Sequence, residues 1–247
     1  MSQAVTYESS NNIALITINR PERLNAINEE VEVGLANAWR KFNQSNDRVA
    51  VLTGAGDKAF SVGKDLEYKA FPEYRRFVPG CDIEVRKPIV AAVSGWCIGG
   101  AITLVQMADL CVASETAKFT YPEAKLGFAG GLIAGLVSRI PHKVAMELML
   151  LGEEISAERA YQVGLVNKLT PPGEHLKGAL IYAERLAKNA PLVLEMLKTF
   201  GIRTLPKSPI EEASFALREV DLVKYSADRL EGLDSFSSKR QPQYQGK

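Results

Sequence analysis

The uncharged segment PIVAAVSGWCIGGAITLVQMA, residues 88–108, decides the fold class that the sequence predicts. It is long enough to cross a membrane, which takes about 20 apolar residues. However, Ser94-Gly95 and Gly99-Gly100 divide it into two short apolar pieces. The β-branched first piece predicts a buried strand over residues 89–93, and the second predicts a buried helix over residues 101–107. We therefore expect a strand, a glycine turn and a helix here rather than a membrane span.

The same kinds of signal extend outward from this segment. Apolar, β-branched runs predict strands over residues 13–19, 49–53 and 110–113. Asn28 can cap a helix over residues 29–42. From Ser156, a predicted helix cap, the pattern is mostly helical, with later boundaries expected at Gly173, Pro191 and Pro209. The order predicts a mixed α/β protein with a helical C-terminal region.

Composition excludes several classes of function. Hydrophobic residues make up 46% and charged residues 24% of the 247 residues, which is typical of a globular protein and not of a disordered or fibrous chain. The 30 Lys and Arg residues against 29 Asp and Glu residues give a net charge of +1. No overall field would therefore attract nucleic acid or an anionic membrane, and we expect neither as a partner.

The cysteines predict no metal site. Cys81, Cys97 and Cys111 show neither the paired spacing of zinc ligands nor the density of a disulfide framework. The first residues also lack the basic start and apolar stretch of a signal peptide. We expect a cytoplasmic protein with free thiols.

The glycine loop GAGDKA, residues 54–59, matches the dinucleotide-binding pattern G-x-G-x-x-G/A. In a dinucleotide site a helix begins at these glycines and presents its N-terminus to a pyrophosphate. The residues that follow here do not predict such a helix, and no acidic strand end follows at the usual spacing. A simple turn is therefore favoured.

A second loop, GWCIG at residues 95–99, has the form of a nucleophile elbow with Cys97 in place of serine. A cysteine hydrolase would also need a histidine to activate the thiol. The chain has only His142 and His175, and both are expected at exposed loop or helix-start positions. A Cys97 hydrolase is kept as an alternative, against a small apolar role for Cys97 at a crowded turn.

A third interpretation takes two loops together, residues 59–66 and residues 95–104. Each offers backbone N–H groups at a glycine turn, and the second does so at a predicted helix N-terminus. Two convergent N–H donors form an oxyanion hole, and glycine lets the backbone approach a ligand closely.

The sequence resembles the crotonase (enoyl-CoA hydratase/isomerase) superfamily along nearly its whole length. The segments that carry the resemblance follow the family's order: residues 19–27 (NRPERLNAI), 59–66 (AFSVGKDL), 95–104 (GWCIGGAITL), 119–127 (FTYPEAKLG), 146–152 with 160–167, and 231–236 with 239–244. The resemblance implies a spiral of repeated β-β-α units over residues 1–190, which would hold the active site. It further implies a helical trimerisation region over residues 191–247, and hence a homotrimer or homohexamer.

The resemblance also implies the site residues. The backbone amides of Lys64 and Gly100 would hold the carbonyl of an acyl-CoA thioester, and Glu123 would act as acid and base. The residues expected to contact coenzyme A are Arg23, Leu24, Ala26, Ala59, Val62, Gly63, Asp65 and Leu66, with Lys239 reaching a phosphate across a subunit boundary. Coenzyme A would enter only as part of the substrate, with no prosthetic group and no metal.

The sequence departs from the hydratases at one position. Hydratases of this family use two glutamates, but Thr103 stands where the first is expected, and a hydroxyl cannot act as a base near pH 7. One glutamate suffices for a 1,3-proton shift, so the sequence favours isomerisation of an enoyl-CoA. Hydration or dehydration with Glu123 and water is the alternative, followed by a non-catalytic acyl-CoA binder. Asp65 is expected to cap a helix rather than to catalyse.

Overall fold

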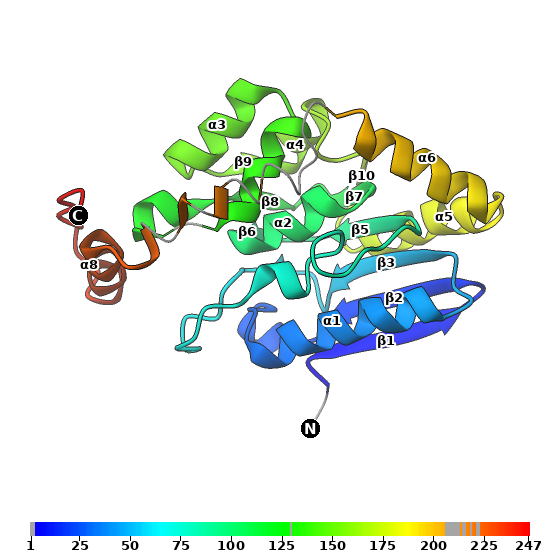
Figure 1. Ribbon diagram of the computed structural model, residues 1–247, viewed down its shortest axis with the longest axis horizontal. Coiled ribbons are helices and arrows are strands. Elements are labelled where there is room, and N and C mark those ends of the chain that lie inside the picture. Colours follow the sequence, from blue (N-terminus) through cyan, green and yellow to red (C-terminus); the bar gives the residue numbers. More distant parts are fainter. Residues whose placement is uncertain (1–2, 129, 206–212, 214–215, 218, 221–222) are drawn as a thin grey trace.

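Two β-sheets form the centre of the molecule, with helices packed around them (Figure 1). The computed structural model describes residues 3–128, 130–205, 213, 216–217, 219–220 and 223–247. The larger sheet has the strand order β1-β2-β3-β5-β7-β10, and its neighbouring strands are parallel except for β1 and β2. Its strands are β1 Val5–Ser10, β2 Ile13–Ile18, β3 Val49–Gly54, β5 Ile89–Val93, β7 Leu110–Ser114 and β10 Lys168–Thr170.

The smaller sheet has the order β4-β6-β8-β9, with only the last pair antiparallel. Its strands are β4 Ala59–Ser61, β6 Trp96–Ile98, β8 Lys118–Thr120 and β9 Ile155–Ser156. Each of β3, β5 and β7 in the larger sheet is followed by a short strand of the smaller sheet and then by a helical segment. These segments are η2 Tyr74–Arg76, α2 Gly100–Met107 and η3 Pro122–Leu126. The repeated β-β-α units confirm the predicted spiral.

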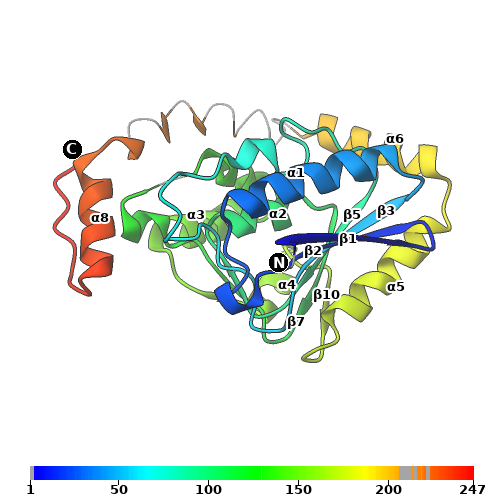
Figure 2. The ribbon, with the colours of Figure 1, turned by 90° about the horizontal axis from the view of Figure 1, so that it is seen from below.

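Alternate residues of the larger sheet face two separate apolar layers. Val49 and Val51 pack with alanines of α5 (His175–Ala187), whereas Ala50 and Leu52 belong to the main core with α1 (Glu29–Gln44). Because successive side chains of a strand point to opposite faces, both faces of the sheet are buried. Figure 2 shows α1 and α5 on opposite sides of the sheet.

The remaining helices surround the smaller sheet and the C-terminal part of the chain. They are η1 Pro21–Arg23, η4 Gly131–Ser138, α3 His142–Leu151, α4 Ala157–Gln162, α6 Pro191–Arg203 and α8 Ala227–Ser237. Apolar side chains on α6 and α8 are exposed, including Phe200, Leu230 and Phe236. Within the described ranges, no helix is long and apolar enough to span a bilayer.

Most elements predicted from the sequence are present. The predicted strands and helices appear within two residues of their expected ends. Within the loop at residues 54–59, residues 55–58 form a bend between β3 and β4 and not a helix start. Asn28 and Ser156 both accept a hydrogen bond from the third residue that follows them, as predicted for caps. Strands β1, β4, β6, β8, β9 and β10 were not predicted, and β6 lies where a glycine turn was expected. Pro209 lies outside the described residues. The division of the chain at residue 190 stays a prediction.

Candidate active site

A glycine turn joins β6 to α2 and meets two side chains from distant parts of the chain. Gly99 has a φ of +59°, and a Cβ atom on it would lie 2.6 Å from Oε1 of Glu123. A Cβ atom on Gly100 would overlap the ring and hydroxyl of Tyr74. Only a backbone without these Cβ atoms lets both side chains approach the N-terminus of α2 so closely.

The loop after β4 lies beside this turn. A Cβ atom on Gly63, whose φ is +75°, would lie 3.4 Å from the backbone nitrogen of Gly100. The Ile27 amide donates a hydrogen bond to the Gly63 carbonyl, and the Ile27 carbonyl accepts one from the Asp65 amide. This is the pattern of a parallel bridge, in which the amide of the residue between them, Lys64, points away from Ile27. Among the described residues, neither the Lys64 nor the Gly100 amide donates a backbone hydrogen bond outside this turn. Both amides are therefore available to a ligand.

Glu123 is a buried carboxylic acid that forms no ion pair within the described ranges. It lies in η3 directly after Pro122, and only 3% of the residue is exposed. No group in the part of the chain that the structure describes hydrogen-bonds its Oε2 atom. Burial raises the pKa of Glu123 to about 8, and a hydrogen bond from its own backbone amide offsets this only in part. Such a carboxyl group can both accept and return a proton near neutral pH.

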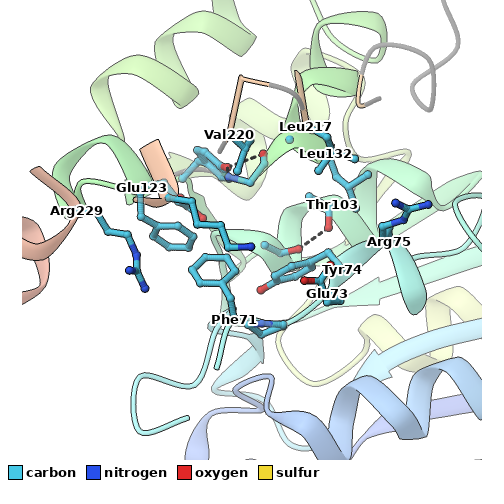
Figure 3. Close-up of a pocket in the computed structure, with 17 residues that line it drawn as sticks. Phe71, Glu73, Tyr74, Arg75, Thr103, Glu123, Leu132, Leu217, Val220 and Arg229 are labelled. Carbon is cyan, nitrogen blue, oxygen red and sulfur yellow. Dashed lines mark hydrogen bonds between the residues drawn. The ribbon is translucent and has the colours of Figure 1, made fainter. Parts of the chain in front are cut away.

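Glu123 opens into a mostly apolar cavity of about 210 Å³, which we call the Glu123 pocket (Figure 3). Its lining combines the η2 segment, the N-terminal half of α2, the loop after η3 and part of the C-terminal region. Phe71 and Phe128 meet edge to face, with ring centroids 4.7 Å apart, and Arg229 lies over Phe71. The other described residues that line it are Pro72, Glu73, Tyr74, Arg75, Gly100, Thr103, Tyr121, Gly130, Gly131, Leu132, Leu217, Val220 and Lys224.

Two free amides, a helix N-terminus and a proton-transferring carboxyl group next to an apolar pocket can stabilise an enolate. The chain matches the model of the enoyl-CoA hydratase/isomerase family over residues 8–247. The chain belongs to this family. It is therefore an acyl-CoA enzyme of the enoyl-CoA hydratase/isomerase type.

Similar proteins cover the whole chain. It is 35% identical to (E)-benzylidenesuccinyl-CoA hydratase of Thauera aromatica, over 98% of this chain and 99% of that protein. It is 34% identical to carnitinyl-CoA dehydratase of Salmonella typhimurium, over the full length of both. The crystal structure of a carnitinyl-CoA hydratase from Mycobacterium avium matches with a TM-score of 0.90 and 34% identity, again over both whole chains.

The structure brings together the predicted catalytic positions Lys64, Gly100 and Glu123, although their roles stay predictions. The Lys64 side chain does not enter the Glu123 pocket, because its ammonium group hydrogen-bonds the carbonyl oxygens of Asp65 and Tyr68. Burial lowers the pKa of Lys64, and nearby Arg229 lowers it further while Asp65 opposes the shift. Only the backbone of Lys64 is thus offered to a ligand.

Most of the residues expected to contact coenzyme A lie on two connected loops. The Val62 amide donates to the Leu24 carbonyl, which joins the loop after η1 to the loop after β4. Ala26, Ala59 and Gly63 are buried, whereas 37% of Leu24 and 56% of Leu66 are exposed. Exposed leucines beside buried small residues leave a surface on which an extended ligand could lie.

Asp65 does not cap a helix, and that expectation is wrong. Its carboxylate pairs with Arg20 at 2.9 Å and Arg23 at 3.3 Å and accepts a hydrogen bond from the amide of Glu67. No helix begins at this point in the described chain. Asp65 instead fastens the η1 loop to the β4 loop. Lys239 is exposed just beyond the C-terminal end of α8 (Figures 1 and 2). The other end of this helix lies near the β4 loop, because Arg229 is close to Lys64.

The Cys97 hydrolase is excluded by geometry. Cys97 is completely buried in the main core and does not line the Glu123 pocket. Burial, with a smaller contribution from Cys111, raises the pKa of the Cys97 thiol well above its usual value, so a thiolate is disfavoured. His175 begins α5, as one of the two expected placements had it, but it is buried and not exposed, and it faces Asp57, 3.9 Å away. His142 is exposed at the start of α3.

Sequence analysis missed Tyr74, Phe71, Phe128 and Arg229. The first two lie between the glycine loops, in a stretch without a recognisable motif, and Arg229 lies more than 100 residues beyond Glu123. The only available signal was a concentration of aromatic residues in residues 68–77. Their meeting depends on tertiary packing that no local pattern specifies.

Proposed function

We propose that this enzyme removes water from, and adds water to, the C2–C3 bond of an acyl-CoA thioester. The observation that carries this proposal is the buried Glu123 carboxyl group, which has a pKa of about 8 and lies against the Gly99–Gly100 turn. The full-length relatives support it, because the two named above are a hydratase and a dehydratase of CoA thioesters.

In dehydration, the amides of Lys64 and Gly100 would donate hydrogen bonds to the thioester oxygen. They would stabilise the negative charge that develops there as C2 loses its proton. Glu123, as a carboxylate, would take this proton and pass it to the oxygen that leaves C3. The C2–H and C3–O bonds break, the C2–C3 double bond forms and water departs, so a single carboxyl group serves both proton transfers. Hydration is the reverse.

Isomerisation of an enoyl-CoA, favoured by the sequence, is the second candidate. One observation supports it: the Thr103 hydroxyl donates its hydrogen to the Gly100 carbonyl at 2.6 Å, and so no second acid or base stands at this position. Glu123 would then move a proton between C2 and C4 without water. The names of the relatives favour hydration and dehydration over this reaction.

The two reactions have opposite optical signatures. Addition of water to a 2-enoyl-CoA removes the conjugated chromophore, whereas isomerisation of a 3-enoyl-CoA creates it. With a panel of 2-enoyl-CoA thioesters, we expect the purified protein to lower the absorbance of the conjugated chromophore and to form the 3-hydroxyacyl products. Formation of the chromophore from 3-enoyl-CoA, with no hydration of any 2-enoyl-CoA, would replace the first proposal by the second.

The proposal includes the binding of coenzyme A as part of the substrate. Arg23, Leu24, Ala26 and the loop from Ala59 through Leu66 would hold it. Lys239 would reach its phosphate from a neighbouring subunit of a homotrimer or homohexamer. A cytoplasmic location is proposed with it.

A further inference from the structure

A second polar side chain reaches the same glycine turn as Glu123. Tyr74 lines the Glu123 pocket, and its hydroxyl lies against Gly100 while the Glu123 carboxyl lies against Gly99. The Cα atoms of consecutive residues are about 3.8 Å apart, so the two groups flank one short piece of backbone. Figure 3 shows Tyr74 beside the hydrogen bond that Thr103 makes to the backbone.

The hydroxyl of Tyr74 is uncommitted in the part of the chain that the structure describes. The other pocket hydroxyls have partners there: Thr103 donates to the Gly100 carbonyl, and Tyr121 both donates to and accepts from the backbone of Gly130. Tyr74 forms no side-chain hydrogen bond to a described residue. An unpaired hydroxyl and an unpaired carboxyl oxygen in one apolar cavity would both gain from a polar atom placed between them.

The backbone that carries Tyr74 is held firmly by α1. The Glu73 amide donates to the carboxylate of Glu32 at 3.1 Å, and the Trp39 indole donates to the Phe77 carbonyl at 2.9 Å. These bonds fix η2 on both sides of Tyr74. Its ring also packs against Phe77, with centroids 5.0 Å apart. The hydroxyl is therefore presented by a rigid support, as a group that orients a reactant must be.

We propose that the Tyr74 hydroxyl hydrogen-bonds the oxygen atom that leaves C3 in dehydration and attacks C3 in hydration. This inference rests on the hydration–dehydration reaction proposed above. Burial, together with the nearby Glu123 carboxyl, raises the pKa of Tyr74 well above its usual value, so the hydroxyl stays protonated. Tyr74 accordingly transfers no proton: it donates its hydrogen bond to the departing oxygen while Glu123 supplies the proton that completes water.

The test compares Tyr74→Phe with wild type in two reactions. The first is hydration of a 2-enoyl-CoA. The second is exchange of the C2 protons of a saturated acyl-CoA in D₂O, which needs the oxyanion hole and Glu123 but has no oxygen at C3. We expect kcat for hydration to fall about 10- to 100-fold, as for a lost hydrogen bond to a group that becomes charged. KM and the exchange rate should be unchanged.

Tyr161→Phe is the matched control, because Tyr161 is exposed on α4 and does not line the Glu123 pocket. It should hydrate like wild type. Hydration by Tyr74→Phe at the wild-type rate would overturn the inference. An equal fall in hydration and exchange would also overturn it, because Tyr74 would then only shape the oxyanion hole. Failure of the proposed function is distinguishable, since wild type itself would then hydrate no enoyl-CoA.

Discussion

Asp65 and Glu123 are buried to nearly the same degree, at 5% and 3% exposed. Their pKa values are nevertheless shifted in opposite directions. Burial alone would raise the pKa of Asp65, but hydrogen bonds from Arg20, Arg23 and the Glu67 amide outweigh it and lower that pKa. Glu123 forms no ion pair with any residue that the structure describes, and burial raises its pKa to about 8.

The partners of a buried carboxyl group decide whether it has a structural or a catalytic role. A carboxylate that is held as an anion by two arginines joins two loops and has no reason to exchange protons. A carboxyl group with an uncommitted oxygen in an apolar cavity is poised to do so, and perturbed acids of this kind are concentrated at active sites. The loop that Asp65 fastens also carries the Lys64 amide. Asp65 therefore positions the amide that is proposed to act together with Glu123.

The largest effect is expected from Glu123→Gln. The amide keeps the size of the side chain but cannot take a proton, so kcat should fall about 100- to 10,000-fold. Affinity for the CoA thioester, measured by calorimetry, should be retained. Glu147→Gln changes an exposed glutamate of α3 in the same way and should leave kcat unchanged. Equal turnover by the two variants would remove Glu123 from the mechanism.

Gly63→Ala should disturb the oxyanion hole. A Cβ atom at this position would lie 2.6 Å from the carbonyl oxygen of Ile98 at a φ of +75°, so the loop must shift and carry the Lys64 amide with it. Loss of one such donor lowers kcat about 100- to 1,000-fold. Gly173→Ala is the matched control, since Gly173 has a φ of +80° with no atom in the way. If both variants lost activity equally, backbone strain and not the hole would be responsible.

Asp65→Asn should affect stability more than chemistry. Removing one member of a buried ion pair costs about 3 kcal/mol in the free energy of unfolding, measured by urea titration near pH 7. Because the pKa of Asp65 is lowered by folding, its stabilisation is present above the usual value of 3.8 and is lost as the pH falls through the folded pKa.

The control for this prediction is Asp82→Asn, which breaks the more exposed Arg75–Asp82 pair and should cost at most about 1 kcal/mol. A cost as small for Asp65→Asn would mean that Asp65 does not fasten the two loops.

The smallest effect on activity is expected from Cys97→Ala. The thiol is buried in the core and takes no part in the reaction, so kcat should match wild type. The lost sulfur atom should lower the free energy of unfolding by about 1 kcal/mol. A large fall in kcat in the correctly folded variant would instead support the Cys97 hydrolase alternative.

Local sequence patterns predicted much of the fold and part of the candidate site. The segment at residues 88–108 became β5, β6 and α2 because glycine turns and apolar runs act locally. Glu123, Lys64 and Gly100 were predicted because each lies in a segment that resembles a family motif. Tyr74 and Arg229 lie in no motif, and only packing against Gly100 and Phe71 brings them to the pocket. Burial of His175 and the ion pairs of Asp65 likewise depend on partners distant in sequence.

The most direct test of the central claim is a pH titration of the Glu123 side chain by NMR. Protein labelled with ¹³C at the glutamate carboxyl would be titrated, and the Glu123 signal would be assigned by its absence from Glu123→Gln. A pKa of about 8 is expected, because burial of this carboxyl group disfavours its charged form. Titration at the ordinary value of about 4.5 would show a solvated or paired carboxylate and would contradict the account.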